Sequence, residues 1–362
     1  MTKDELFGII INEPDKNVYE RAKKRFDRLA KPIDGFGYFE DMVCKIASNQ
    51  RTDRPDISKK GLVIMIADNG VTSEGVSQTS SDVTLSVAKL MGAKKSTVGV
   101  MTEGYLVDII PVDLGINSDE IIPGVTGMKI KHGTGNISRE PAMTEEECFA
   151  AISAGMSVAD MCSKRGIKLV ATGEMGIGNT TTSTALFCAL SGCGVEEAVG
   201  RGAGLSDEGL KKKTDVIKRS LSLHKLNNIP VNALEKPYVF NALKSVGGLD
   251  IAGLAGLYTR CAQLGITIVI DGFISAVAAL VAYAVNPNVK GYLLASHSGK
   301  EKGSQMVLDM LGLVPVIHAD MALGEGTGAV MLFPLLDMVM SVYNNGISFS
   351  DTDIAQYERF DI

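Results

Sequence analysis

Short, continuous apolar runs that each end in a polar turn recur along this 362-residue chain and limit its possible folds most strongly. The clearest run covers residues 61–67 (GLVIMIA) and leads into the turn Asp68-Asn69-Gly70. A strand buried on both faces is apolar throughout, whereas a strand with one solvent-exposed face alternates apolar and polar residues. We predict further strands over residues 97–100, 105–112, 167–171, 266–270, 292–295 and 314–317, although Pro315 disfavours the last one.

Stretches with helical spacing of apolar residues lie between these runs. They cover residues 81–91, 144–165, 181–191, 206–223, 250–264, 275–285 and 302–311. Parallel strands need a crossover connection, usually a helix, so this alternation is typical of a parallel sheet. We therefore predict an α/β protein with a Rossmann-like parallel sheet and helices on both of its faces. Ligands of such sheets bind at the carboxyl ends of the strands.

Two more helices are predicted before the first strand, over residues 18–29 and 38–47. Pro32 separates them, because proline cannot continue a helix. After about residue 333 the chain returns to helix and ends in a polar tail. We expect residues 1–60 and 335–362 to form a smaller helical domain, and residues 61–334 to form the α/β domain.

Composition and charge exclude several classes of function. A formal charge of -6 makes the chain a poor general ligand for nucleic-acid phosphates. The N-terminus carries acidic residues around a short apolar run, which is not typical of a signal peptide. The most apolar long stretch, residues 265–285, contains Asp271, and an unpaired carboxylate is costly inside a membrane. We expect a cytoplasmic protein with small-molecule substrates and no nucleic-acid or membrane partner.

The six cysteines and four histidines restrict metal and disulfide chemistry. No two cysteines are spaced as CxxC, so local spacing cannot assemble a Cys/His zinc cluster. We expect reduced, mostly buried thiols and no metal or other cofactor.

Two glycine-rich loops are candidates for binding an anion. The segment GEMGIGNTTT, residues 173–182, follows a predicted strand and opens a predicted helix. Its glycines allow backbone N–H groups to approach an anion at the helix N-terminus, but a structural turn with a helix cap has the same sequence. The segment GRGAGLSDEGLKKK, residues 200–213, offers either cations for a ligand or a solvated helix face.

Three other polar loops also follow predicted strands. Residues 68–84 offer many hydrogen-bond donors to a small molecule, or form a surface loop. His297 follows a serine, but no GxSxG motif exists, so a structural histidine fits as well as a nucleophile pair. Glu325 lies between two glycines, which allow another molecule to approach its carboxylate, and a solvent-exposed turn carboxylate is the alternative.

Taken together and in order, the segments of the chain resemble those of the nicotinate-nucleotide:dimethylbenzimidazole phosphoribosyltransferase family. The resemblance extends from about residue 20 to about residue 345. The similar segments are AKPIDGFGYFE (30–40), TGNISREPAMT (134–144), GEMGIGNTT (173–181), VGRGAGLSDEGL (199–210), VGGLDIAGLAG (246–256), DGFISAVAALVA (271–282), SH (296–297) and LGEGTGA (323–329).

The resemblance implies an enzyme that moves 5-phosphoribose from nicotinate mononucleotide to a benzimidazole. The products are nicotinate and an α-ribazole phosphate, which becomes the lower nucleotide loop of cobalamin. The family implies a homodimer without a cofactor. It implies Glu325 as the catalytic base and Glu174 as a second acidic residue of the site.

The resemblance also implies two groups of binding residues. Substrate phosphate and ribose are expected at Gly176, Gly178, Asn179, Thr180, Thr181, Gly202, Gly204 and Lys213. The acceptor base is expected at Gln78, Thr79, Ser80, Val87, Ser298 and Leu323.

Three positions depart from the family pattern near the expected acceptor site. Asn69 replaces a histidine, Gly299 replaces a serine, and Val87 replaces a glutamine. The departures leave open a different acceptor, such as a purine, a phenolic ring or another benzimidazole. A nucleotide-binding relative without catalysis is a further alternative, although a binding module needs neither Glu325 nor Glu174.

Overall fold

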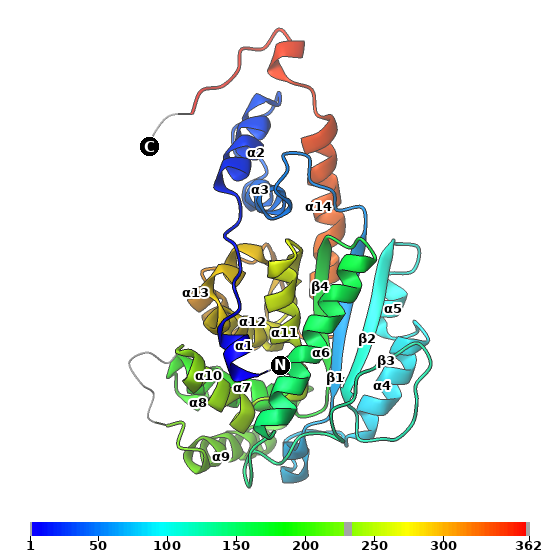
Figure 1. The fold of residues 1–362 in the computed structure, drawn as a ribbon, viewed down its shortest axis with the longest axis vertical. Helices are drawn as coiled ribbons and strands as arrows, with labels where there is room; N and C mark the ends of the chain where they lie inside the picture. Colours follow the sequence, from blue (N-terminus) through cyan, green and yellow to red (C-terminus); the bar gives the residue numbers. More distant parts are fainter. Residues whose placement is uncertain (1, 228–233, 360–362) are drawn as a thin grey trace.

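The computed structural model describes residues 2–227 and 234–359 and contains a six-stranded parallel sheet (Figure 1). The strand order is β3-β2-β1-β4-β5-β6, which is the order of doubly wound Rossmann sheets. The strands are β1 (Lys60–Ala67), β2 (Val107–Gly115), β3 (Thr126–Gly127), β4 (Leu169–Met175), β5 (Thr267–Ile270) and β6 (Leu293–Ala295). The prediction of a parallel α/β fold is confirmed.

The central strand β1 explains why its sequence is continuously apolar. It pairs with β2 along one edge and with β4 along the other, and all eight of its residues are buried. Leu62, Ile64 and Ile66 belong to one core cluster, whereas Val63 and Met65 belong to the other. Side chains of a strand alternate between its faces, so both faces of the sheet are covered.

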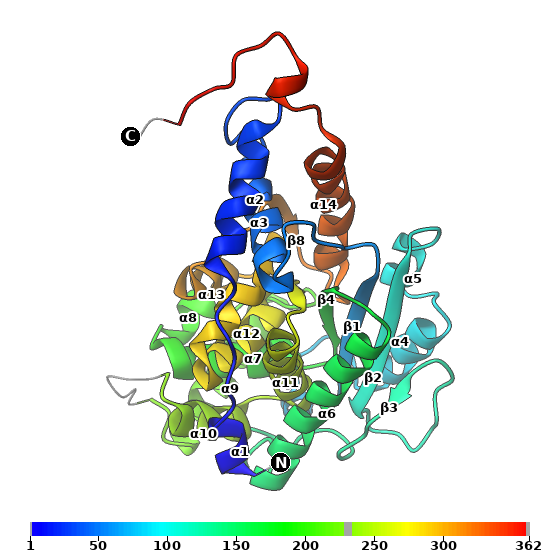
Figure 2. The ribbon, with the colours of Figure 1, turned by 45° about the horizontal axis from the view of Figure 1, so that its top comes forward.

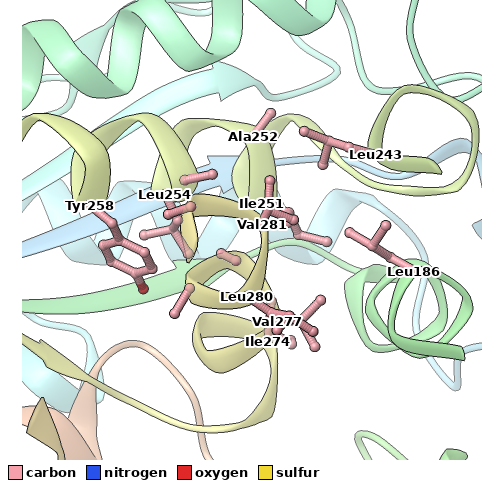
Figure 3. Close-up of a cluster of buried hydrophobic side chains, with 14 of the residues drawn as sticks. Leu186, Leu243, Ile251, Ala252, Leu254, Tyr258, Ile274, Val277, Leu280 and Val281 are labelled. Atoms are coloured by element: carbon pink, nitrogen blue, oxygen red, sulfur yellow. The ribbon is translucent and has the colours of Figure 1, made fainter. Parts of the chain in front are cut away.

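Two groups of helices provide this cover. One core cluster contains side chains of α6 (Glu145–Lys164), α7 (Asn179–Ser191), α10 (Lys236–Val246), α11 (Leu249–Gln263), α12 (Phe273–Val285) and α13 (Gly303–Leu311). The other contains side chains of α2 (Lys16–Arg28), α3 (Tyr38–Gln50), α4 (Asp82–Gly92), α5 (Thr97–Met101) and α14 (Thr327–Asn345). Figure 3 shows the first cluster where α11 and α12 meet.

The shorter elements complete the chain. They are α1 (Lys3–Phe7), α8 (Val195–Ala198), α9 (Asp207–Leu223), the 3-10 helices η1 (Gly70–Glu74), η2 (Pro287–Tyr292) and η3 (Phe349–Asp351), and the strands β7 (His297–Gly299) and β8 (Ile317–Met321). Strands β7 and β8 form a separate two-stranded parallel sheet. Helix α9 follows the second glycine-rich loop, and the Ser206 side chain caps it by accepting the Gly209 N–H.

Two strand predictions are wrong. Residues 97–100 lie in the short helix α5, because the Ser96 side chain accepts the N–H of Gly99 and starts a helical turn. The run at 314–317 is mostly irregular, and β8 begins only at Ile317. Pro315 has no N–H for a sheet ladder, which accounts for the later start. Helices α1, α8 and α10 were not predicted, and α14 begins before residue 333.

Helices α2 and α3 lie beside the long C-terminal helix α14, whereas α1 lies at the opposite end of the molecule (Figure 2). The rings of Phe26 in α2 and Tyr343 in α14 are 4.8 Å apart between centroids. The Arg25 Nε donates to the Tyr343 carbonyl over 3.0 Å. The expected boundary at residue 335 falls inside α14, which also contacts β4. The division into two domains stays a prediction.

Helix α14 is long and apolar enough to cross a membrane by length and composition alone. Within the described residues it is the single helix that meets both criteria. However, 56% of it is buried inside the protein, and Leu332, Phe333 and Leu336 belong to the same core cluster as Leu62. Core packing therefore accounts for its apolar composition.

Helices α6 and α11 contact each other backbone to backbone. A Cβ atom at Gly155 would lie 1.8 Å from the Gly253 carbonyl oxygen. A Cβ atom at Gly256 would lie 2.0 Å from the Ile152 carbonyl oxygen. Such distances are far below van der Waals contact, so this helix pair requires glycine at both positions.

We predict that Gly155→Ala lowers the free energy of unfolding by about 1–3 kcal/mol, because overpacking outweighs the gain in helix propensity. Urea unfolding monitored by circular dichroism measures this change. Ser157→Ala, at an exposed position of the same helix, is the control and should change stability by less than about 0.5 kcal/mol. An unchanged unfolding midpoint in Gly155→Ala would contradict the packing argument.

Candidate active site

A cavity of about 300 Å³ lies at the carboxyl ends of the strands. The loops after β4, β5 and β6 and the loop before α14 line it. Eight residues expected from the sequence reach it: Val87, Glu174, Gly176, Asn179, Thr180, Gly202, Leu323 and Glu325. The position agrees with the rule for ligand sites of parallel sheets.

Glu325 occupies a left-handed turn at the start of α14. Its φ angle is 59°, between 86° at Gly324 and 81° at Gly326. Three successive residues with positive φ are rare, and glycine adopts this region without steric cost. The turn presents the Glu325 carboxylate to the cavity, where its Oε2 accepts the Val98 N–H over 3.3 Å.

Asp271, at the carboxyl end of β5, holds this turn in place. Its Oδ2 accepts the Gly326 N–H over 3.2 Å, and its Oδ1 accepts the Ala329 N–H over 3.0 Å. Gly173 makes room for the turn, because a Cβ atom there would lie 2.4 Å from the Gly326 nitrogen. Asp271 is not among the site residues expected from the sequence. The Asp-Gly pair directly after an apolar strand was the available signal.

His297 supports the same turn. Its Nδ1 lies 3.0 Å from the Ser296 Oγ and 4.0 Å from the Asp271 Oδ1. A Cβ atom at Gly328 would lie 2.1 Å from the Nδ1, so the ring packs directly on the backbone of α14. These contacts favour a structural role for His297 over a nucleophile pair.

Glu174 lies beside Glu325 in the cavity. A Cβ atom at Gly324 would lie 3.1 Å from the Glu174 Oε1. The Asn179 amide donates to the Glu174 carboxyl and lies 3.4 Å from the Asp250 Oδ2. Burial, helped by the nearby carboxyls of Asp250 and Asp271, raises the pKa of Glu174 to about 8. Glu174 therefore carries its proton at neutral pH.

Lys213 lies behind the cavity wall and does not line it. Its buried Nζ donates to the Thr180 Oγ1 over 2.9 Å and to the Gly200 carbonyl over 3.1 Å. Burial lowers the pKa of Lys213 to about 8, although the charge of Glu301 opposes this shift. Gly202, with φ at 52°, brings its backbone close to the same Thr180 hydroxyl.

The other expected residues lie outside the cavity lining: Gln78, Thr79, Ser80, Gly178, Thr181, Gly204 and Ser298. Gln78 donates to the Gly204 carbonyl, and so joins the two loops. Thr79 and Ser80 are exposed, whereas Thr181 is buried. The roles of these residues stay predictions.

The three departures from the family pattern separate into two groups. Val87 and Gly299 line the cavity. Asn69 does not line the cavity, and its side chain is buried between the ends of β1 and β4. Its Nδ2 lies 3.4 Å from the carbonyl oxygens of Ala67 and Ile177, so it connects the ends of β1 and β4.

A family model described as phosphoribosyltransferase matches residues 11–354. A curated relative from Acetivibrio thermocellus, named nicotinate-nucleotide–dimethylbenzimidazole phosphoribosyltransferase, is 40% identical over 96% of this chain and 97% of its own. The chain belongs to this family. A relative of the same name from Clostridioides difficile is 36% identical over 96% of this chain and 99% of its own.

Solved structures agree with the family assignment. The crystal structure of CobT from Thermus thermophilus matches this phosphoribosyltransferase with a TM-score of 0.87 and 32% identity. The match covers 94% of this chain and 100% of the other. The protein is therefore an enzyme of the glycosyltransferase class. Across residues 2–227 and 234–359, no group of three His, Cys, Asp or Glu side chains is placed to hold a metal ion.

We predict that Glu174→Gln makes the stability of the phosphoribosyltransferase less dependent on pH. The unfolded carboxyl has a pKa near 4.5 and the folded one about 8, so the unfolded chain binds fewer protons between these values. The protonated Glu174 contributes fully to the free energy of unfolding below pH 4.5. This contribution is lost as the pH rises through about 8. Between about pH 6 and about pH 9, the Tm of the variant should therefore fall less than the Tm of the wild type.

Differential scanning calorimetry across this range measures the effect. Glu103→Gln, at an exposed position outside the cavity, is the matched control and should follow the wild type. Equal losses of Tm in the wild type and Glu174→Gln would contradict the burial of a protonated Glu174.

Proposed function

We propose that this enzyme transfers 5-phosphoribose from nicotinate mononucleotide to 5,6-dimethylbenzimidazole or a related base. The products are nicotinate and α-ribazole 5′-phosphate, for the nucleotide loop of cobalamin. The proximity of Glu325, Glu174 and the glycine-rich start of α7 in one cavity carries the proposal. The names of the curated relatives support it.

Glu325 acts as the base in this proposal. Nicotinate leaves from a cationic pyridinium, so its departure needs no acid. The incoming azole nitrogen attacks the anomeric carbon while its other ring nitrogen loses a proton. Glu325 accepts that proton, because the left-handed turn projects its carboxylate into the cavity. Glu174 already holds its own proton and instead donates a hydrogen bond to a substrate oxygen or nitrogen.

The start of α7 binds the ribose phosphate. Gly176, Asn179 and Thr180 line the cavity there, and the helix N-terminus adds partial positive charge. Lys213 reaches this region through the Thr180 hydroxyl. A phosphate dianion nearby favours the charged form of Lys213, so binding of the phosphate and protonation of the lysine reinforce each other.

We infer a cytoplasmic homodimer that associates through the face covered by α4, α5 and α14. Large apolar side chains are exposed on these helices and on the turn after α5: Leu90, Val100, Met101, Leu106, Met331 and Met338. Helices α5 and α14 contact each other, so their exposed side chains lie on neighbouring elements. Exposed apolar patches of this kind are typical of protein interfaces.

The test of the proposed function uses the purified enzyme, nicotinate mononucleotide and a panel of acceptor rings. Mass spectrometry identifies any ribosylated ring and the released nicotinate. Mononucleotide binding without nicotinate release with any ring would instead favour a nucleotide-binding protein without catalysis.

We predict that Glu325→Gln lowers kcat by about 10²–10⁴-fold while mononucleotide binding is kept, because the amide cannot accept the proton. Steady-state kinetics and calorimetric titration measure the two effects. Glu103→Gln is again the control. Turnover near that of the wild type would exclude Glu325 as the base.

We predict that Lys213→Met weakens mononucleotide binding and changes acceptor binding little, because the variant keeps most of the side-chain length but removes the charge. Calorimetric titration with each ligand separates the two. Lys212→Ala is the matched control, since Lys212 is the exposed neighbour on the same helix. Equal weakening of both ligands would point to a general loss of structure instead.

We predict broad acceptor use, including benzimidazoles without the two methyl groups. Val87 and Gly299 offer no polar side chain to the cavity, so at these two positions the site cannot strongly reject a ring that lacks a matching polar group. Competition between pairs of acceptors at equal concentration, with products separated by chromatography, gives the ratios. Exclusive use of dimethylbenzimidazole would contradict this prediction.

A further inference from the structure

Two cysteine thiols lie close together at the end of α7. Cys188 is in the last turn of α7, and Cys193 is in the link to α8. Their Sγ atoms are 3.7 Å apart, and both thiols are free. Neither residue lines the cavity, and the proposed transfer reaction uses neither.

The two thiols differ in their access to solvent. Cys193 is partly exposed, whereas Cys188 is buried, with 3% of its surface accessible. An oxidant from solution therefore reaches Cys193 first. Cys188 can react only with a sulfur that is already beside it.

The surroundings favour a thiolate at Cys193. The Cys193 Sγ lies 3.7 Å from the Cys188 Sγ and 3.1 Å from the Ser191 Oγ. The contact with the Cys188 thiol, and then the hydrogen bond that the Ser191 hydroxyl donates, lower the pKa of Cys193, although burial and the charge of Glu197 oppose the shift. The same contact raises the pKa of Cys188. A thiolate is the reactive form of cysteine, so Cys193 is the nucleophile of the pair.

The backbone around Cys193 allows the two sulfurs to approach further. Gly192 and Gly194 flank it, and Gly192 has a left-handed φ of 79°. A Cβ atom at Gly194 would meet only the Glu197 side chain, at an ordinary contact distance of 3.5 Å, so no close backbone contact holds the link at this residue. A disulfide bond is about 2.05 Å long, and this link can supply the remaining movement.

We propose that Cys188 and Cys193 form a redox site that a hydroperoxide converts into an intramolecular disulfide. With hydrogen peroxide, the Cys193 sulfur attacks one oxygen, the O–O bond breaks, and a sulfenic acid and water form. The Cys188 sulfur then attacks the Cys193 sulfur, and the S–O bond breaks. The hydroxyl leaves as water with the Cys188 proton. Two thiols and one hydrogen peroxide thus give one disulfide and two waters, and a dithiol reductant reverses the reaction.

The sequence offers a direct test. Trypsin releases residues 169–201 as one peptide, which contains Cys188 and Cys193 and no other cysteine. The folded full-length enzyme is treated with hydrogen peroxide and then unfolded in the presence of an alkylating reagent. After digestion with trypsin, mass spectrometry measures the mass of this peptide. We expect this peptide to lose two hydrogen atoms and to take up no alkyl group. After reduction with dithiothreitol it should take up two.

Variants and internal controls distinguish Cys193, which reacts with the peroxide, from Cys188, which forms the disulfide with it. In Cys188→Ser, Cys193 should react with a sulfenic-acid trap, because no resolving thiol remains. In Cys193→Ser, which changes the partly exposed residue, Cys188 should stay reduced and alkylatable. Cys162 and Cys261 are both buried and should stay reduced in every sample. Alkylation of both thiols after peroxide, or addition of oxygen to Cys193 without the linked form, would overturn the proposal.

Discussion

Burial of β1 on both faces is the constraint on which the rest of the molecule depends. A strand without solvent contact must pair its backbone groups along both edges, and β1 does so with β2 and β4. These pairings bring the turn after Ala67 and the turn after Met175 to the same edge of the sheet. The crossover helices then close over both faces. The cavity lies at this edge because the buried strands end there.

The turn that carries Glu325 has a strained backbone. Its non-glycine residue is left-handed, and this conformation persists because surrounding groups fix it. Asp271 supplies two hydrogen bonds from β5, His297 packs on the following helix, and Gly173 leaves the space. Three different strand ends therefore determine the direction of one carboxylate.

The charged groups around the cavity are held in states that a ligand can change. Burial keeps Glu174 protonated and makes Lys213 easier to neutralise. In the proposed function, an anionic phosphate near Lys213 favours the charged lysine, and a C=O group or an unprotonated ring nitrogen of the ligand accepts a hydrogen bond from the Glu174 carboxyl. Desolvation thus makes the protonation of both residues sensitive to a charged or polar ligand nearby.

The parallel α/β fold follows from the amino-acid sequence alone, since apolar runs and helical spacing are local patterns. The sequence also located the loops of Glu174 and Glu325, because each loop follows or precedes a recognisable element and resembles a known family. The short run at residues 97–100 was misread, because four apolar residues fit a capped helical turn as well as a strand. Three contacts become visible only in the folded chain: Asp271 supports the Glu325 turn, Lys213 lies behind the cavity wall, and Cys188 lies beside Cys193. Loop paths bring side chains from separate strand ends together, and local sequence patterns do not encode those paths.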